Sequence, residues 1–335
     1  MKGKNIVYLF IISLFAITCK NDNRVIDVSN IHLDIKVKRL DKDIFEIDLD
    51  NIRNDVDSLK NIYDEFFKLY NFSVIRLGNP DNEKYCNNLK AYVTDYTMNK
   101  VYSETMKVYP DLKIEEQDLE NAFKRFKYYF PNKKTPAVYS YIGGFNQSIV
   151  VADSILGIGL DKYLGSNCVF YDKLRIANYL QFNMNRDMIA IDAIKSWLLT
   201  EFVYNDSIDN LVNNMIYQGK IQYALKYLFP EKADSLLFGF KGKDIYWCEN
   251  NESQMWNYLI ENKLLFSTDY MLINKFINPA PFTAGFPNAS PGRATIWVGE
   301  KIVSNYMKQN SNISLNELMH ENNYQKILSG SKYEP

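Results

Sequence analysis

Histidine and cysteine are scarce in this chain of 335 residues, which has two histidines and four cysteines. Zinc sites usually take three or four His, Cys or carboxylate ligands, and the cysteines here form no CxxC pair. The sequence therefore predicts neither a metal nor a cofactor. Three cysteines, Cys86, Cys168 and Cys248, lie far apart along the body of the chain and cannot all pair with one another. We expect them to be mostly buried thiols.

An excess of charge of one sign is also missing, because 39 Lys and Arg residues balance 40 Asp and Glu residues. Nucleic-acid binding needs a concentrated basic face, and no segment supplies one. Nucleic acid is therefore excluded as a partner, and no small-molecule substrate is indicated by any motif.

Long apolar runs are missing as well. The longest candidate runs from Ile6 to Ile17, short of the roughly 20 residues that a transmembrane helix needs. Lys2 and Lys4 precede it, which is typical of a secretory signal peptide over residues 1–18. The polar residues 20–23 follow at once, so the run is not expected to be a permanent span.

The end of this segment, Leu14-Phe15-Ala16-Ile17-Thr18-Cys19, resembles a bacterial lipobox. In a lipobox the cysteine carries diacylglycerol and an N-acyl chain such as palmitate, which together suffice for stable anchoring. We expect Cys19 to be the lipidation site, residues 19–32 a tether, and residues 33–335 a single domain. The membrane is then a partner through the lipid anchor, and the protein belongs to the cell envelope, facing the periplasm or the outer surface. The alternative is an ordinary cleaved signal that contains a cysteine.

Periodicity predicts an α+β fold that is mainly helical. Residues 33–38 alternate apolar and polar as a half-buried strand does, and three further strands are expected over 137–142, 148–151 and 155–160. Apolar residues that recur with the period of a helix predict helices over 50–70, 116–129, 171–184, 188–203, 208–228, 252–264, 292–307 and 315–328. The segment 188–203 is apolar on nearly all sides, which indicates a central buried helix on which the small sheet and the other helices pack.

Several short motifs occur in an order that resembles a known family. The chain resembles the gliding-motility lipoprotein GldB family of Bacteroidetes over nearly its whole length. The motifs that carry the resemblance are Val37-Lys38-Arg39-Leu40-Asp41, Tyr128-Tyr129-Phe130-Pro131, Gly159-Leu160-Asp161-Lys162-Tyr163, Met215-Ile216-Tyr217-Gln218-Gly219-Lys220, Phe276-Ile277-Asn278-Pro279-Ala280-Pro281-Phe282 and Ser290-Pro291-Gly292-Arg293.

The resemblance also implies a zincin-like fold, in which a small sheet precedes a central helix that bears His-Glu-x-x-His in active members. Here the 188–203 helix offers Asp192, Lys195, Ser196 and Glu201 and no histidine. His320 is followed by Glu321 but lacks a second histidine, so we interpret it as a solvated helix residue. The fold would then be zincin-like without the catalytic site, and no catalytic or metal-binding residue is predicted.

The sequence therefore predicts a non-catalytic envelope lipoprotein that supports gliding motility or related machinery by binding other envelope proteins. One alternative is a zincin-related hydrolase that uses Asp192 and Glu201, although nine helical residues place these on opposite faces. Another is a lipoprotein that binds cell wall or glycan through its 25 tyrosines and 4 tryptophans.

One residue is singled out for binding. Ser290-Pro291-Gly292-Arg293 opens the 292–307 helix, with Ser290 as the expected N-cap and Pro291 at the first helical position. Arg293 either pairs with an acid such as Glu300 or Asp269, or binds an anionic group from a partner or from cell wall. Asp153 and Asp161 are interpreted as strand-end and turn residues, because eight extended residues would separate them by roughly 26 Å.

Overall fold

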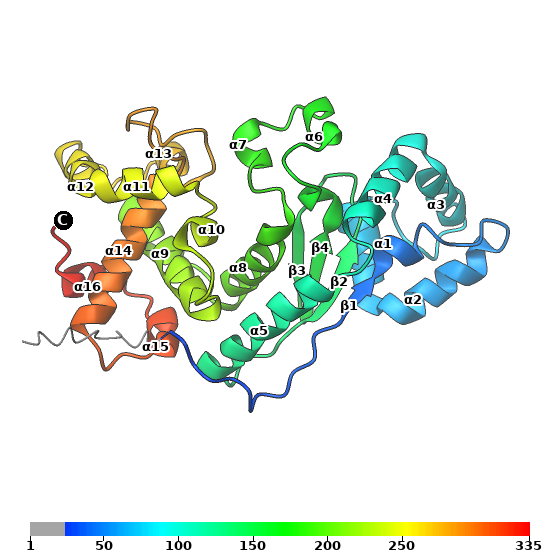
Figure 1. Cartoon of the computed structure of the whole chain (residues 1–335), viewed down its shortest axis with the longest axis horizontal. Coiled ribbons are helices and arrows are strands. Elements are labelled where there is room, and N and C mark those ends of the chain that lie inside the picture. Colours follow the sequence, from blue (N-terminus) through cyan, green and yellow to red (C-terminus); the bar gives the residue numbers. More distant parts are fainter. Residues whose placement is uncertain (1–23) are drawn as a thin grey trace, which may run out of the picture.

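A computed structural model describes residues 24–335, with the helices outnumbering the strands of a small sheet (Figure 1). The signal peptide and Cys19 lie outside the described residues, so their assignment stays a prediction. Residues 24–36, which include the end of the expected tether, contain no helix or strand. The expected α+β, mainly helical class is confirmed.

The described residues form one sheet whose strand order is β1-β2-β4-β3. β2 pairs in parallel with both β1 and β4, whereas β3 and β4 form an antiparallel hairpin. The first strand starts at Val37 rather than at residue 33, because Val37 already pairs with Val138 near the start of β2 and earlier residues have no neighbouring strand. The strands are β1 (Val37–Arg39), β2 (Ala137–Tyr141), β3 (Ile149–Ala152) and β4 (Ile155–Gly159).

Helices cover both faces of the sheet, as the buried, mostly parallel strands require. On one face Tyr139 and Tyr141 pack against α2, and the Phe66 ring stacks on Tyr139 with centroids 4.3 Å apart. On the other face Val138 and Leu156 join the main core. The helices of this half are α1 (Leu40–Asp43), α2 (Ile52–Leu69), which continues into the π-helix Tyr70–Val74, α3 (Tyr85–Thr94), α4 (Tyr96–Val108) and α5 (Lys113–Tyr129).

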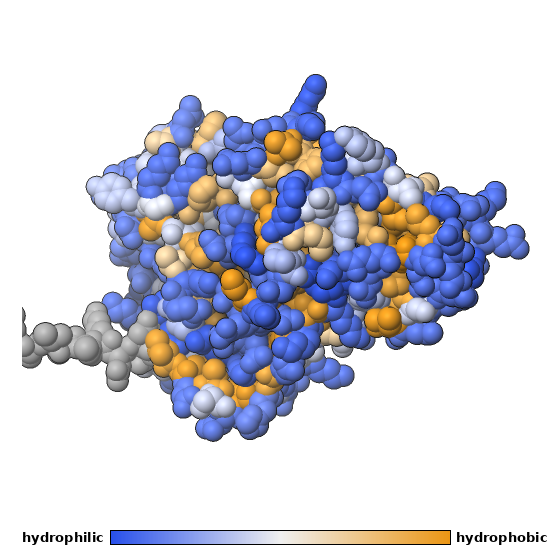
Figure 2. All heavy atoms as spheres, turned by 45° about the vertical axis from the view of Figure 1, so that its right-hand side comes forward, coloured by the Kyte–Doolittle hydropathy of each residue, from blue (hydrophilic) through white to orange (hydrophobic). Residues whose placement is uncertain are grey.

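The C-terminal half is helical. It contains α6 (Val169–Lys173), α7 (Asn178–Gln181), α8 (Ile189–Glu201), α9 (Leu211–Leu228), α10 (Asp234–Phe238), α11 (Gly242–Asn250), α12 (Glu252–Glu261), α13 (Tyr270–Ile277), α14 (Ala294–Gln309), α15 (Leu315–His320) and α16 (Tyr324–Ser331). Figure 2, which brings the side of α2 and α3 forward, shows a mostly hydrophilic surface with scattered apolar patches, as expected of amphipathic helices that cover a core.

Two expected helices are broken. The predicted helix 171–184 is wrong: the chain forms α6 and α7 instead, because Arg175 adopts a left-handed conformation (φ 54°) just after α6. The predicted helix 315–328 is interrupted between α15 and α16, where Asn323 accepts a hydrogen bond from the Lys326 N–H and starts a new helix. Side-chain capping of this kind competes with helix continuation.

The expected central helix is confirmed as α8, which packs on α5, α9, β3 and β4 (Figure 1). Ile189, Ala193, Ile194 and Trp197 are buried in the main core. The helix is less uniformly apolar than predicted, because Asp192 and Lys195 lie on one side of it and line a cavity.

The C-terminal half is built around α9 and α14, which cross at two glycines. A Cβ atom on Gly299 would lie 1.9 Å from the Met215 carbonyl oxygen, and one on Gly219 would lie 2.3 Å from the Gly299 carbonyl carbon. The two backbones can approach this closely only because both residues lack a side chain. Beside the crossing, Lys226 Nζ lies 2.8 Å from the buried Glu300 carboxylate.

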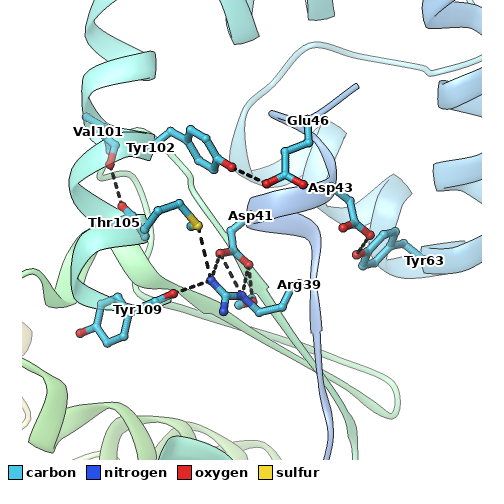
Figure 3. Close-up of polar contacts among 11 residues, drawn as sticks. Arg39, Asp41, Asp43, Glu46, Tyr63, Val101, Tyr102, Thr105 and Tyr109 are labelled. Carbon is cyan, nitrogen blue, oxygen red and sulfur yellow. Dashed lines mark hydrogen bonds and ion pairs between the residues drawn. The ribbon is translucent and has the colours of Figure 1, made fainter. Parts of the chain in front are cut away.

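A buried ion pair links the first strand to the rest of the N-terminal half (Figure 3). Arg39 donates from Nη2 to Asp41 Oδ2 at 2.7 Å and to the Tyr109 carbonyl at 3.0 Å. Asp41 is fully buried and also accepts from the Ser140 hydroxyl on β2. These contacts join β1 and α1 to β2 and to the end of α4.

Along residues 24–335, no helix combines the length and apolar character needed to cross a membrane. The three cysteines of the body are free thiols, of which only Cys248 is fully buried; Cys86 and Cys168 are half-buried.

Candidate functional site

A cavity of about 480 Å³ lies where α8 meets the segments that contain α7, α10 and the N-terminus of α14. Its volume falls within the range of small-ligand pockets. Four stretches of chain far apart in sequence supply its charged side chains: the 3₁₀ turn Leu160–Tyr163, α8, the start of α11, and the loop before α14. Ser148 and the segment that contains α7 add uncharged polar side chains. The residues among them that carry charge or a phenol are Lys162, Tyr163, Asp192, Lys195, Lys241, Lys243, Asp244 and Arg293.

Asp192 is held by a phenol from the 3₁₀ turn. Tyr163 Oη donates to Asp192 Oδ2 at 3.0 Å. Burial raises the pKa of Asp192, while Lys195, the Tyr163 hydrogen bond and Arg293 oppose that rise. The pKa of Tyr163 lies well above its ordinary value because the phenol is buried beside this carboxylate. Tyr163 therefore remains a proton donor that fixes the orientation of Asp192.

Lys195 follows Asp192 by three residues, so both side chains project from the same side of α8. Burial and the charge of Arg293 lower the pKa of Lys195 to about 7, while Asp192 opposes the shift. Within residues 24–335, Lys195 Nζ forms no hydrogen bond or ion pair. An anion entering the cavity would favour the charged form of this amine, because opposite charge raises the pKa of a base.

Arg293 reaches the cavity from the N-cap of α14, where its backbone is left-handed (φ 56°). Its Nη2 donates to the Phe238 carbonyl at 2.9 Å. Gly239, also left-handed, makes room for this contact: a Cβ there would lie 3.1 Å from Arg293 Nη2 and 2.8 Å from Asn183 Nδ2. Burial lowers the pKa of Arg293 and Asp192 opposes this. The guanidinium stays charged, because an arginine side chain is not deprotonated in proteins.

The loop before α14 is fixed by Thr283 rather than by the expected N-cap. Thr283 Oγ1 donates to the Pro291 carbonyl at 2.6 Å and accepts from the Ala294 N–H at 2.8 Å, and the Thr283 N–H donates to Ser290 Oγ. Ser290 therefore holds the loop and does not cap the helix, which starts at Ala294.

The predicted pairing of Arg293 with Glu300 or Asp269 is wrong. Glu300 accepts from Lys226 and from Ser304 at 2.7 Å, on a buried stretch of α14 away from its N-terminus. Asp269 caps α13 by accepting from the Met271 and Leu272 N–H groups. The acid that acts on Arg293 is Asp192.

Three helix N-termini meet at the cavity, those of α8, α11 and α14. The dipole of each helix adds partial positive charge at this end. Together with five cationic side chains against two acidic ones, this makes the cavity favourable for an anion.

Other residues considered from the sequence lie elsewhere. Glu201 pairs with Lys133 at 3.0 Å at the far end of α8, so the separation of Asp192 from Glu201 is confirmed. His320 is exposed in α15, with Nδ1 2.8 Å from the Asn316 carbonyl, as expected of a solvated helix residue. Asp161 is a buried turn residue that accepts from the Gly143 and Phe145 N–H groups.

In the part of the chain that the structure describes, no cluster of three His, Cys, Asp or Glu residues could hold a metal.

Sequence reasoning placed Arg293 among possible anion ligands but missed Tyr163 and the role of Lys195. The sequence signal that could have indicated this site is an acid and a base three residues apart on an otherwise apolar helix. Nothing in the sequence shows that the loop before α14 reaches this side of α8.

The fold and the site define an α+β, mainly helical protein with a cationic cavity beside its central helix. Residues 21–335 match the family model described as gliding motility protein GldB, and the chain belongs to this family. It is therefore a gliding-motility-associated lipoprotein of the cell envelope, and the resemblance noted from the sequence is confirmed. No curated protein and no solved structure gave a significant match to the chain.

Proposed function

We propose that this chain is a non-catalytic lipoprotein, anchored through Cys19, that supports gliding motility or related envelope machinery by binding other envelope proteins. The family match over residues 21–335 carries the proposal. It is supported by a tether-length segment, residues 24–36, that precedes β1 without regular structure. The body is expected to stand clear of the membrane surface and to meet its partners there.

We further propose that the fold is a distant, non-catalytic relative of the zincins. In favour of this, a small sheet precedes the buried helix α8, and a cavity opens along the polar side of that helix. On the side of α8 that lines the cavity, the charged residues are Asp192 and Lys195, which are three residues apart, whereas the two histidines of His-Glu-x-x-His are four residues apart. Neither an aspartate–lysine pair nor the arginine beside it forms the nitrogen and sulfur ligand set that zinc favours.

A hydrolase is the second candidate, because the pKa of Lys195 is lowered to about 7 beside Asp192 in a cavity. An amine with this pKa has the proton affinity that a general base needs at neutral pH. Two experiments separate the candidates. Cross-linking mass spectrometry on the tagged full-length protein in its own cells is expected to capture envelope proteins, and the purified protein is expected not to cleave peptides with or without added zinc.

Peptide cleavage that disappears in Lys195→Met or Asp192→Asn would overturn the non-catalytic proposal. Retention of the protein on purified peptidoglycan, without cross-links to proteins in cells, would favour the cell-wall-binding alternative instead.

A further inference from the structure

We propose that the cavity beside α8 binds the carboxylate at the free end of a peptide, with Arg293 and Lys195 as its cationic partners. This inference rests on the proposed function, since it names the chemistry by which the protein would recognise an envelope partner. The hydrogen bonds already described for these residues do not require a ligand in the cavity, and the proposal assigns one.

The cationic side chains that line the cavity can still bind an anion, because the acids of the lining are engaged elsewhere. Of the two acids in the lining, Asp244 accepts the Lys241 backbone N–H at 2.8 Å as part of the helix cap, and Asp192 is held by Tyr163. In contrast, Lys195 has no hydrogen-bond partner among the described residues, and Arg293 makes one hydrogen bond there, to a carbonyl. Both cations are only partly exposed, and a bound anion would favour their charged forms.

The count of charges favours a monoanion. The three innermost charged groups are Asp192, Lys195 and Arg293, which carry a net charge of one when Lys195 is protonated. One carboxylate neutralises the charge of these three groups, whereas a phosphate dianion would place a surplus negative charge beside Asp192, which only the outer lysines of the lining could offset. A guanidinium also matches the two oxygens of a carboxylate in a paired geometry.

The mouth of the cavity suits a peptide. Tyr179, Leu180 and Phe182 line it, and all three side chains are more than one third exposed. Lys241 Nζ lies 5.0 Å from the centroid of the Phe182 ring. An apolar side chain near the end of a peptide would cover these residues while its carboxylate reaches Arg293. Exposed apolar groups around a polar centre are typical of such binding sites.

Two sources of terminal carboxylate exist in an envelope: the C-terminus of a protein, and a wall stem peptide that ends in D-alanine. Isothermal titration of the full-length protein in detergent would use N-acetyl-Leu-Ala-Ala as the free acid, the same peptide as its C-terminal amide, a peptide that ends in D-Ala-D-Ala, and inorganic phosphate. The free acid is expected to bind, with the amide weaker by roughly tenfold or more.

Preference for the D-Ala-D-Ala peptide would identify wall as the source, and preference for the all-L acid would identify a protein C-terminus. Either result supports the carboxylate proposal. Equal binding of acid and amide, tighter binding of phosphate, or no binding of any probe would overturn it. None of these failures bears on membrane anchoring or on cross-links elsewhere on the surface, which test the proposed function separately.

Two variants of the cavity separate a loss of binding from a loss of folding. Arg293→Lys retains the charge but loses the paired geometry, and Lys195→Met removes the charge at similar length. Each is expected to weaken binding of the free acid by roughly tenfold. Lys113→Met serves as the matched control, because this lysine is exposed and distant from the cavity lining. Lys195→Met is expected to melt no lower than the parent, since it removes a charge that burial disfavours. Unchanged affinity in both cavity variants would contradict the proposal.

Discussion

Asp41 is a buried acid that links α1 to β1 and β2. It is fully buried and receives two donors, the Arg39 guanidinium and the Ser140 hydroxyl. Removing one partner of a buried ion pair leaves the other charge without compensation. We expect Asp41→Ala to lower the free energy of unfolding by about 3–5 kcal/mol.

Chemical denaturation would measure this loss. Asp57→Ala is a suitable control, because Asp57 is exposed and only loosely paired with Lys60 at 3.5 Å, so its effect should stay within about 0.5 kcal/mol. Similar stabilities for the two variants would contradict the role assigned to the Arg39–Asp41 pair.

Asp161 is a buried acid. Its deprotonation should make the protein less stable as the pH rises, whereas deprotonation of most carboxylates makes a protein more stable. Burial raises its pKa to about 6, against the hydrogen bonds from Phe145 and Gly143. The folded protein therefore binds this proton more tightly than the unfolded chain. Its contribution to stability is complete below the ordinary pKa of 3.8 and is lost as the pH rises to about 6.

Asp161→Asn removes this titration. Relative to the parent, the variant should gain roughly 2 kcal/mol of stability as the pH rises from about 4 to 6, since each pKa unit corresponds to about 1.4 kcal/mol. Denaturation curves at several pH values measure the difference. A difference that stays constant over this window would show that Asp161 titrates normally.

Among the helices, the crossing of α9 and α14 is the closest contact of the C-terminal half. An alanine at residue 299 would bring a Cβ atom within 1.9 Å of the Met215 carbonyl oxygen, so the two helices would have to separate. Gly299→Ala should therefore destabilise the protein by about 1–3 kcal/mol or more. Thermal unfolding would report this as a lower Tm.

Gly242→Ala is the matched control, because a Cβ at this helical glycine would meet no atom within 4 Å. If Gly299→Ala unfolded at the same temperature as Gly242→Ala, the helices would not be held together at this crossing.

Strong periodicity made the elements of the core predictable from sequence. The strands after residue 136 and the helix α8 follow from runs of apolar residues that only a buried element tolerates. The helices α3, α4 and α11 were not predicted, because their apolar positions are interspersed with polar residues. The largely apolar helix α13 was not predicted either; at eight residues it is too short to show a clear helical period. The break between α6 and α7 escaped prediction because Arg175, a residue that usually favours helix, takes a left-handed conformation.

The candidate site was only partly predictable, for a related reason. Arg293 was identified from its place at the start of a helix, but its electrostatic partner Asp192 lies 101 residues earlier, on α8. Their electrostatic interaction depends on how the loop held by Thr283 lies against that helix. Long-range arrangements of this kind leave no local pattern in the sequence.

For the whole molecule, anchoring at Cys19 should decide where the protein is found. Cys19→Ala is expected to move the chain from the membrane fraction to the soluble fraction, because anchoring requires the lipid chains that this cysteine would carry. Cys86→Ser, which changes a half-buried thiol of the body, should leave it in the membrane fraction. Fractionation with immunoblotting measures both, and a membrane-bound Cys19→Ala variant would contradict lipid anchoring.

The central claim is that an anchored, non-catalytic body acts through the cationic cavity beside α8. The most direct measurement is colony spreading by cells in which Arg293→Lys replaces the parent protein, with the envelope level and the Tm of the variant matched to the parent. The account predicts that spreading is lost although the protein is present and folded. Spreading equal to that of the parent strain would contradict it.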